Sequence, residues 1–432
     1  MKPAHPFLLL LVVGTFACTS TRRTISSENP LDTLFRSPAL ARHHVGFALY
    51  DPAAKRMLYE RQADRYFVPA SNTKLFTFYA GLCVLGDSVP ALRYRAAGDS
   101  LVIWGTGDPS LLHPDLPRSG VSEFLQNRPE RLVFSTQNFI QPPYGPGWAW
   151  DDYNDDYQPE LTPLPLYGNI LRFRPDRAGH WQPALNYFRR YLAYDSALVA
   201  VRRNQTTNLF TLPTAPVRPT AVQDVPYLTS PEMTVQLLAD TLKRRVSLRP
   251  VPFDPAAQTL HGLPTDTLYR RMLQVSDNLL AEQIMLLVSG TQGDTLSVPR
   301  GIGLVLKTHL ADLPDLPRWV DGSGLSRYNL FTPRSLVRLL EKIREKVPQE
   351  RLFALLPASG RPGTLRNQFR GEAPFVFAKT GSLTGVYNLS GYLVARSGRV
   401  LMFSFMNNNF TNPTSEIRRE VERVLRAVRE AN

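Results

Sequence analysis

Residues 69–86 read PASNTKLFTFYAGLCVLG. The mostly apolar run that ends before Gly86 predicts a helix over residues 73–85, with Ser71 at its first turn. Residues three apart share one face of a helix, so Lys74 is expected beside the Ser71 hydroxyl. A serine needs a nearby base to act as a nucleophile, and Lys74 is the candidate. Taken alone, Ser71 is better explained as a plain helix N-cap.

Two further strings strengthen the catalytic interpretation. They are Ser276-Asp277-Asn278, which begins 205 residues after Ser71, and Lys379-Thr380-Gly381, which begins 103 residues after Ser276. The chain has only eight lysines. Lys74 alone lies three residues after a serine, and Lys379 alone begins a K-T-G string. A chance coincidence of all three strings in this order is therefore improbable.

The three strings are similar to the S-x-x-K, S-x-N and K-T-G elements of penicillin-binding proteins and serine β-lactamases. Longer segments narrow the resemblance: residues 276–282 (SDNLLAE), 320–326 (VDGSGLS) and 377–383 (FAKTGSL). With Gly107-Asp108-Pro109 and Gly147-Trp148, they resemble the D-alanyl-D-alanine carboxypeptidase/endopeptidase family of low-molecular-mass, class C penicillin-binding proteins. The resemblance extends from about residue 37 to the end of the chain.

The resemblance implies a serine peptidase that acts on peptidoglycan stem peptides and is acylated by β-lactam antibiotics. Burial and the nearby cation Lys379 would lower the pKa of Lys74, so that Lys74 could activate Ser71. Ser276 would relay the proton to the leaving amine, and Asn278 would hold Lys74 and the substrate amide. The expected catalytic residues are Ser71, Lys74, Ser276 and Asn278, and the expected substrate-binding residues are Lys379, Thr380, Gly381, Ser382 and Asp152.

The resemblance also assigns contacts to the substrate. Lys379 and Thr380 would bind the terminal carboxylate of the D-alanine, and the backbone N–H groups of Ser71 and Ser382 would form the oxyanion hole. The family usually has threonine where this chain has Ser382, but a backbone donor tolerates that change. Asp152 would face the free amine of a diamino-acid stem peptide. The alternative for Asp152 is a solvated acidic loop.

Two other functions are weighed against this one. A class A β-lactamase would have its second motif much sooner in the chain. A class C β-lactamase would use Y-x-N, which Tyr167-Gly168-Asn169 matches, but we interpret this tripeptide as a loop because Ser276-Asp277-Asn278 supplies the relay. A non-catalytic module that binds peptidoglycan or senses β-lactams would be expected to have lost a key residue. Ser71, Lys74 and Lys379 are all present.

Composition sets outer limits on the function. With 432 residues and 43% hydrophobic content, the chain is long enough for about three domains with cores. A net charge of +13 suits an anionic cell wall or phospholipid surface. We expect no nucleic-acid partner, because the chain has no clustered basic helix or basic-aromatic stripe. We expect no metal or cofactor, because the histidines lack ligand spacing and the acidic run 151–157 lacks the glycine and glutamate of a calcium loop.

Alternating strands from both ends of the chain predict one antiparallel sheet flanked by helices, an α+β fold. By resemblance it is a serine β-lactamase/transpeptidase-like domain with a large, mainly-β inserted region. The expected strands are 44–51, 56–60, 375–379, 386–395 and 400–406, and the expected helices beyond the first are 268–288, 335–346 and 414–431. We assign residues 37–93 and 265–432 to the catalytic domain and residues 94–264 to the inserted region.

The first residues predict export. Residues 1–18 contain the positive Lys2, an apolar run over 7–13 and a small-residue ending at Cys18, as in a signal peptide. Cys18 resembles the cysteine of a bacterial lipoprotein box, although Thr15 stands where a leucine is expected. Residues 19–36 would be the tether. The sequence thus predicts a periplasmic enzyme with a lipid anchor at Cys18, and simple cleavage is the alternative.

Overall fold

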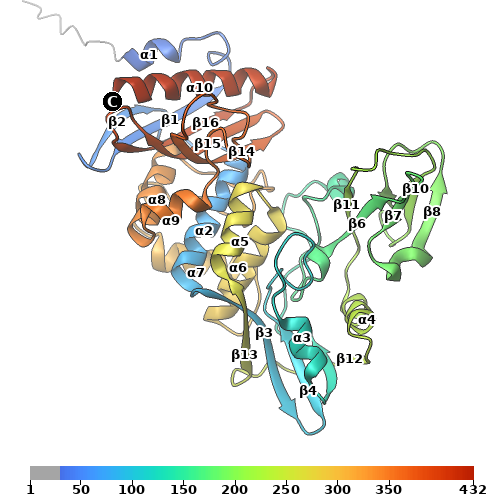
Figure 1. Cartoon of the computed structure of the whole chain (residues 1–432). Coiled ribbons are helices and arrows are strands. Elements are labelled where there is room, and N and C mark those ends of the chain that lie inside the picture. Colours follow the sequence, from blue (N-terminus) through green and yellow to red (C-terminus); the bar gives the residue numbers. More distant parts are fainter. Residues whose placement is uncertain (1–29) are drawn as a thin grey trace, which may run out of the picture.

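A five-stranded antiparallel sheet forms the centre of one lobe of the computed structural model, which describes residues 30–432 (Figure 1). The strand order is β14-β15-β16-β1-β2, so strands from the two ends of the chain lie side by side, as the sequence predicts. Phe47 of β1 lies opposite Phe405 of β16. The strands are β1 His44–Asp51, β2 Arg56–Arg61, β14 Val376–Leu383, β15 Val386–Val394 and β16 Val400–Asn408.

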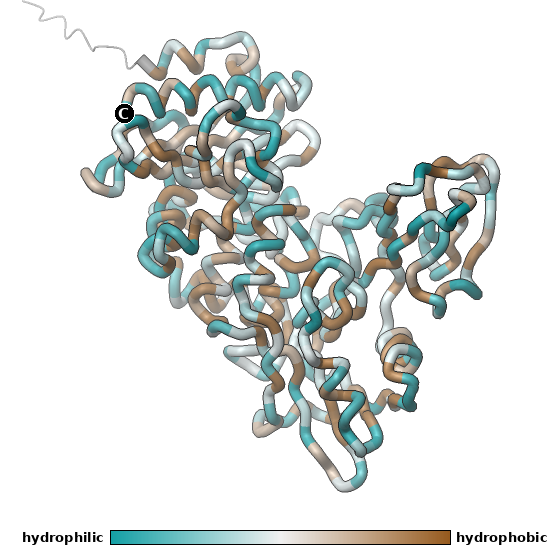
Figure 2. The backbone as a smooth tube through the Cα atoms, viewed as in Figure 1, coloured by the Kyte–Doolittle hydropathy of each residue, from teal (hydrophilic) through white to brown (hydrophobic). Residues whose placement is uncertain are grey.

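Both faces of this sheet are covered, because neighbouring residues of a strand point to opposite sides. In β16, Phe403 packs in the apolar cluster of α10 (Thr414–Ala431). Met402 packs on the other side, in the cluster of α2 (Thr73–Val84) and α8 (Pro333–Lys346). Polar and apolar residues alternate along α10, which appears as teal and brown segments in Figure 2. The helix predicted over 414–431 is therefore confirmed, and the short α1 (Pro30–Leu34) lies beside it (Figure 1).

The helical layer on the other face is built around two buried helices, α2 (Thr73–Val84) and α6 (Asn278–Gln292). α2 confirms the helix predicted from residues 69–86. Its first nine residues are all buried, so it carries its polar side chains into the interior. The helices packed around this pair are α5 Thr265–Gln274, α7 Val298–His309, α8 Pro333–Lys346 and α9 Gln349–Leu355.

The single helix predicted over 268–288 is wrong, because the structure breaks it at the second motif. α5 ends at Gln274 and α6 begins at Asn278. Between them Ser276 adopts φ 65°, in the left-handed region, and the Asp277 side chain accepts a hydrogen bond from Leu280 N (3.0 Å). Asp277 thus caps a new helix. The apolar period continues on both sides of the break, which is why the sequence pattern conceals it.

The middle of the chain forms a separate, mainly-β part with its own apolar core. Its largest sheet has the order β12-β5-β4-β3-β13, in which β3 (Ser88–Ala97) pairs with β13 (Gln258–Pro264). The helices are α3 (Val121–Asn127) and α4 (Pro231–Leu242). The other strands are β4 Ser100–Gly105, β5 Arg131–Ser135, β6 Ile170–Pro175, β7 Trp181–Pro183, β8 Leu192–Asp195, β9 Arg202–Arg203, β10 Phe210–Pro213, β11 Gln223–Pro226 and β12 Val246–Leu248.

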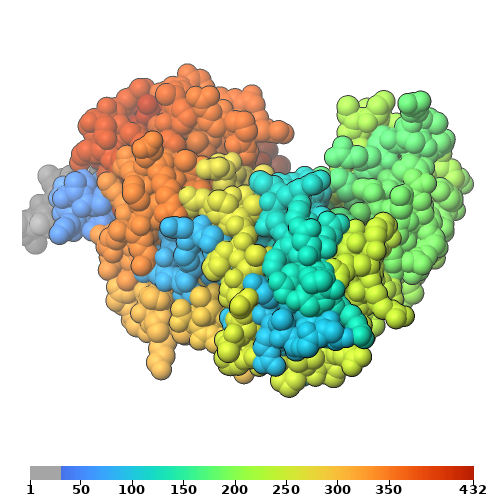
Figure 3. Space-filling view, turned by 60° about the horizontal axis from the view of Figure 1, so that its bottom comes forward, coloured from blue at the N-terminus to red at the C-terminus, as the bar shows by residue number. Residues whose placement is uncertain are grey.

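The space-filling view shows an open notch between the orange to red C-terminal lobe and the green part of the middle region (Figure 3). We propose that the inserted region begins near Ser88 and ends near Pro264, since β3 and β13 pair as its entry and exit strands. The predicted boundaries of the inserted region, at residues 93 and 265, are close to these positions.

No helix among residues 30–432 is long and apolar enough to cross a membrane.

Candidate active site

Ser71 lies in a short 3₁₀ turn, Ala70–Asn72, that leads directly into α2. The preceding Ala70 adopts φ 47°, which is uncommon for a residue with a side chain. The neighbouring Gly324 has φ 88°, and a Cβ atom there would come within 1.9 Å of the Ala70 carbonyl oxygen. Only glycine allows this approach. The turn that presents Ser71 is thus supported from the loop around Gly324.

Lys74 is fully buried and holds three groups together. Its Nζ donates to Ser71 Oγ at 3.0 Å and to Asn278 Oδ1 at 2.6 Å. It also donates to the backbone oxygen of Ser323 at 2.7 Å. The structure therefore brings together Ser71, Lys74 and Asn278, which the sequence places on two distant helices.

The electrostatic surroundings of Lys74 favour a proton-accepting amine. Burial lowers its pKa from 10.5 to about 8, against the opposing attraction of the carboxylates of Asp321, Glu282 and Asp277. Burial also raises the pKa of Glu282, and the charge of the nearby Asp321 contributes to that rise. A lysine with a pKa near 8 has a substantial neutral fraction at neutral pH. Lys74 is therefore suited to act as a general base.

Lys379 and Ser276 form the second half of the site. Lys379 Nζ donates to Ser276 Oγ and to the Thr380 backbone oxygen, each at 2.9 Å. Burial lowers the pKa of Lys379 well below its usual value, and the nearby Lys74 lowers it further. The two lysines are therefore close, but the predicted effect of Lys379 on the pKa of Lys74 is replaced by that of burial, and it is Lys74 that lowers the pKa of Lys379. Lys379 binds the serine of the second motif.

Strand β14 lies directly against the turn that holds Ser71. The Asn72 side chain donates to the Lys379 backbone oxygen at 2.8 Å. A Cβ atom at Gly381 would lie 2.4 Å from the Pro69 carbonyl oxygen, so glycine is needed for this close packing. Thr380 is nearly buried, and Ser382 is exposed near the end of the strand. The K-T-G string thus forms one wall beside Ser71.

The loop that follows Trp319 is part of the site, although no role was predicted for it. Asp321 accepts hydrogen bonds from Gly324 N (2.8 Å) and Ser326 N (2.7 Å), and Glu282 accepts from Ser323 N (2.7 Å). These buried carboxylates position the Ser323 carbonyl against Lys74. The segment VDGSGLS could have indicated this role, but it was used only to identify the family that the chain resembles.

The inserted region contributes to the same site. The Asn278 side chain donates to the Tyr157 backbone oxygen at 2.9 Å, and Trp148 Nε1 donates to Asp321 Oδ2 at 2.9 Å. Asp152, on the short helix Trp150–Asn154, is half-buried, and burial raises its pKa. The inserted region therefore supports Asn278 and the loop behind Lys74.

A cavity of about 260 Å³ adjoins the second motif. Ser276 and Asn278 line it from the catalytic side, and Asp156 and Asp224 line it from the inserted region, whereas Asp152 does not line it. Burial and the charges of Asp224 and two other aspartates raise the pKa of Asp156. Two of the three aspartates in the lining are compensated, since Asp224 pairs with Arg172 and Asp277 pairs with Arg271.

The Tyr167-Gly168-Asn169 tripeptide is a turn inside the inserted region, as we interpreted it. All three residues have positive φ, and the Asn169 side chain donates to the Glu160 backbone oxygen at 2.8 Å. It is Asn278 that contacts Lys74. The Y-x-N string therefore does not supply the relay of this site.

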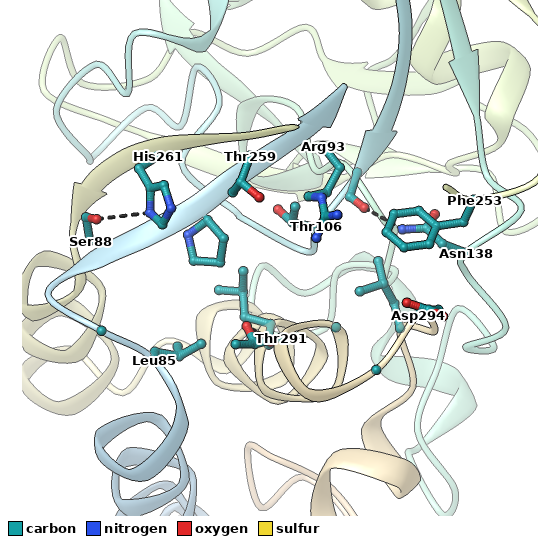
Figure 4. A pocket seen from close by; sticks show the side chains of 17 residues that line it. Leu85, Ser88, Arg93, Thr106, Asn138, Phe253, Thr259, His261, Thr291 and Asp294 are labelled. Atoms are coloured by element: carbon teal, nitrogen blue, oxygen red, sulfur yellow. Dashed lines mark hydrogen bonds between the residues drawn. The ribbon is translucent and has the colours of Figure 1, made fainter. Parts of the chain in front are cut away.

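A separate cavity of about 280 Å³ lies between the end of α6 and strands β3 and β13 (Figure 4). Arg93, Phe253 and His261 line it from the inserted region, and Thr291 and Asp294 line it from the other side. None of the predicted site residues lines it. Among residues 30–432 there is also no group of three or more histidine, cysteine, aspartate or glutamate side chains arranged to hold a metal ion.

A serine held by a buried lysine, with a second lysine on the adjoining strand, defines a serine peptidase of the penicillin-binding class. The comparisons with known proteins agree. The chain belongs to the D-Ala-D-Ala carboxypeptidase 3 (S13) family, which it matches over residues 27–184 and 219–428. The family and the enzyme class predicted from the sequence are confirmed.

Individual relatives match most of the chain. It is 28% identical to the D-alanyl-D-alanine carboxypeptidase of Actinomadura sp. (strain R39), over 95% of this chain and 86% of the relative. It is 25% identical to the D-alanyl-D-alanine carboxypeptidase DacB of Haemophilus influenzae, over 85% of this chain and 86% of the relative. The crystal structure of penicillin binding protein 4 (dacB) from Haemophilus influenzae has the same fold, with a TM-score of 0.72 at 19% identity, and covers 93% of this chain and 98% of that one.

Proposed function

We propose that the protein hydrolyses D-alanyl-D-alanine ends of peptidoglycan stem peptides through an acyl-enzyme on Ser71. The observation that carries the proposal is the 3.0 Å hydrogen bond between Lys74 Nζ and Ser71 Oγ. The lowered pKa of Lys74, about 8, supports it as the base. In its neutral form the amine accepts the hydroxyl proton as Ser71 Oγ attacks the scissile carbonyl carbon.

The remaining steps use the other residues of the site. The tetrahedral oxyanion is stabilised by the backbone N–H groups of Ser71 and Ser382, and Lys379 and Thr380 bind the terminal carboxylate. Ser276 passes the proton from Lys74 to the leaving D-alanine amine as the peptide bond breaks. Water then attacks the ester carbonyl carbon and gives a proton to Lys74. The ester bond breaks, Lys74 returns the proton to Ser71 Oγ, and the shortened peptide leaves the enzyme.

The products of digestion test this proposal directly. Purified peptidoglycan fragments incubated with the enzyme should lose one terminal D-alanine per uncrosslinked pentapeptide, and mass spectrometry of the muropeptides detects that loss. Cleavage of D-alanyl cross-links in the same digest would add endopeptidase activity. Absence of both products, with a folded enzyme that still binds penicillin, would contradict the proposal.

Asp152 is proposed to bind the free amine of a diamino-acid stem peptide. Its half-buried carboxylate supports an ion pair worth about 1 kcal/mol. Asp152→Asn should therefore raise KM several-fold for a substrate that carries the amine, and should change KM little for an analogue that lacks it. Steady-state kinetics on both substrates measure this difference.

Asp156→Asn is the matched control, because Asp156 lies on the same loop and lines the cavity beside Ser276. Equal effects of Asp152→Asn on the two substrates would refute the proposed role. An amine-dependent effect confined to Asp156→Asn would move the amine site to that cavity.

We propose that the protein is exported to the periplasm and tethered by a lipid on Cys18. The signal-like residues 1–18 support this location, although they lie outside the described residues. The intact mass of the mature protein should correspond to a lipid-modified chain that begins at Cys18. An unmodified N-terminus at another residue would remove the tether but not the export.

A further inference from the structure

A groove of about 1120 Å³ lies between residues 360–370 and the start of α10. Arginine dominates its lining, and all five of its arginine side chains are exposed. The only acidic residue in the lining is Glu422. The five are Arg361, Arg366, Arg370, Arg418 and Arg419.

Nothing in the described part of the chain neutralises these arginines. None of the five forms an ion pair within residues 30–432, and Glu422 itself accepts hydrogen bonds from Arg426. The other arginines of α10 behave differently: Arg423 pairs with Glu420, and Arg426 and Arg429 pair with glutamates too. On α10, the arginines without an ion pair are thus the two that line the groove, Arg418 and Arg419. With the three arginines of residues 360–370 they create a positive potential that attracts anions.

The groove and the cavity beside the second motif have one lining residue in common. Val275 lines both the groove and the cavity that contains Ser276 and Asn278. Gln274 also lines the groove, and its backbone oxygen accepts from Thr364 N at 3.1 Å. The arginine groove therefore lies next to the second motif, on the side of Val275.

We propose that this groove binds carboxylates of neighbouring stem peptides while one stem peptide occupies the active site. The inference rests on the proposed function, because it takes polymeric peptidoglycan as the substrate. Each uncleaved D-alanyl-D-alanine end carries a carboxylate, and the polymer repeats such ends along a strand. The planar guanidinium fork binds a carboxylate through two parallel hydrogen bonds. Several weak contacts on one polymer raise the apparent affinity without any change in the catalytic residues.

The test compares binding to insoluble peptidoglycan with hydrolysis of a short soluble peptide. The triple variant Arg361→Gln/Arg366→Gln/Arg419→Gln removes three side chains for which the structure shows no hydrogen bond or ion pair. Pelleting with peptidoglycan, in a Ser71→Ala background that prevents digestion, should show at least about tenfold weaker binding for the triple variant at low salt. With Ser71 intact, kcat/KM on a soluble peptide ending in D-alanyl-D-alanine should change less than about twofold, since the groove lies outside the catalytic contacts.

Arg177→Gln/Arg218→Gln/Arg245→Gln is the matched control. It removes the same charge from three exposed arginines of the inserted region.

Amidation of the peptidoglycan carboxylates with a carbodiimide should abolish the difference between wild type and the groove variant. Equal losses in both triple variants, or a groove effect that survives amidation, would overturn the proposal. A loss seen only with vesicles of anionic phospholipid would also overturn it and would assign the groove to a membrane surface. Failure to cleave the soluble peptide would refute the proposed function, whatever the binding result.

Discussion

Replacing Ser71 by alanine should abolish the covalent adduct that the protein forms with a fluorescent penicillin. The β-lactam amide and carboxylate imitate the D-alanyl-D-alanine end, so the drug meets the same lysines as the substrate. Without Ser71 Oγ there is no atom positioned beside Lys74 to form the ester. Gel fluorescence after denaturation measures the adduct, and release of D-alanine should fall to the background rate in the same variant.

A matched control separates loss of the nucleophile from loss of the fold. Ser397→Ala changes an exposed turn between β15 and β16 and should label like the wild type. Ser71→Ala removes one oxygen from a half-buried site and should unfold at nearly the same temperature as the wild type. Release of D-alanine by a folded Ser71→Ala protein would show that another residue is the nucleophile.

The wild-type adduct should be long-lived. Deacylation of a penicilloyl ester needs a base that activates water, and Glu282 is the glutamate that the structure places near Lys74. Glu282 is buried, and its two oxygens accept hydrogen bonds from Gly322 N and Ser323 N. It is therefore held behind the loop, away from the Ser71 ester. Rapid turnover of penicillin by the purified enzyme would instead indicate a β-lactamase.

Replacing Lys74 by alanine should slow acylation by about 10²-fold or more, which corresponds to at least about 2.7 kcal/mol in the activation barrier. The amine is the base for Ser71, and its loss also leaves Asn278 Oδ1 and the Ser323 carbonyl without this donor. Lys74→Arg should not restore the rate, because a guanidinium stays protonated at working pH. Stopped-flow labelling with the fluorescent penicillin measures the rate constant.

The pH dependence distinguishes a base from a structural support. Because burial lowers the pKa of Lys74 to about 8, the neutral amine is the minor form below that pH and the major form above it. The acylation rate of the wild type should therefore rise about tenfold per pH unit below 8 and level off above it. The residual acylation rate of Lys74→Ala should not show this rise below pH 8. If the rate of that variant rose with pH in the same way, the titrating group would be a residue other than Lys74.

Local patterns account for what the sequence alone could predict. The helix over 414–431 and the strand over 44–51 were predicted at their observed bounds, because a 3.6-residue or 2-residue apolar period is contained within each segment. The helix over 268–288 failed for the same reason. Its apolar period runs through 275–277, whereas the break depends on one capping aspartate.

The candidate site likewise has a part that could be predicted from local strings and a part that could not. The chemistry could be predicted from Ser71, Lys74 and Lys379, since these residue types at these spacings have few other uses. The groups that surround these residues could not be predicted, because they come from segments that are distant in the chain. The Ser323 carbonyl reaches Lys74 across 249 residues of chain, and Trp148 reaches Asp321 across 173. Such contacts leave no periodic trace, because each needs one backbone atom or one side chain at a place that the packing of distant segments sets.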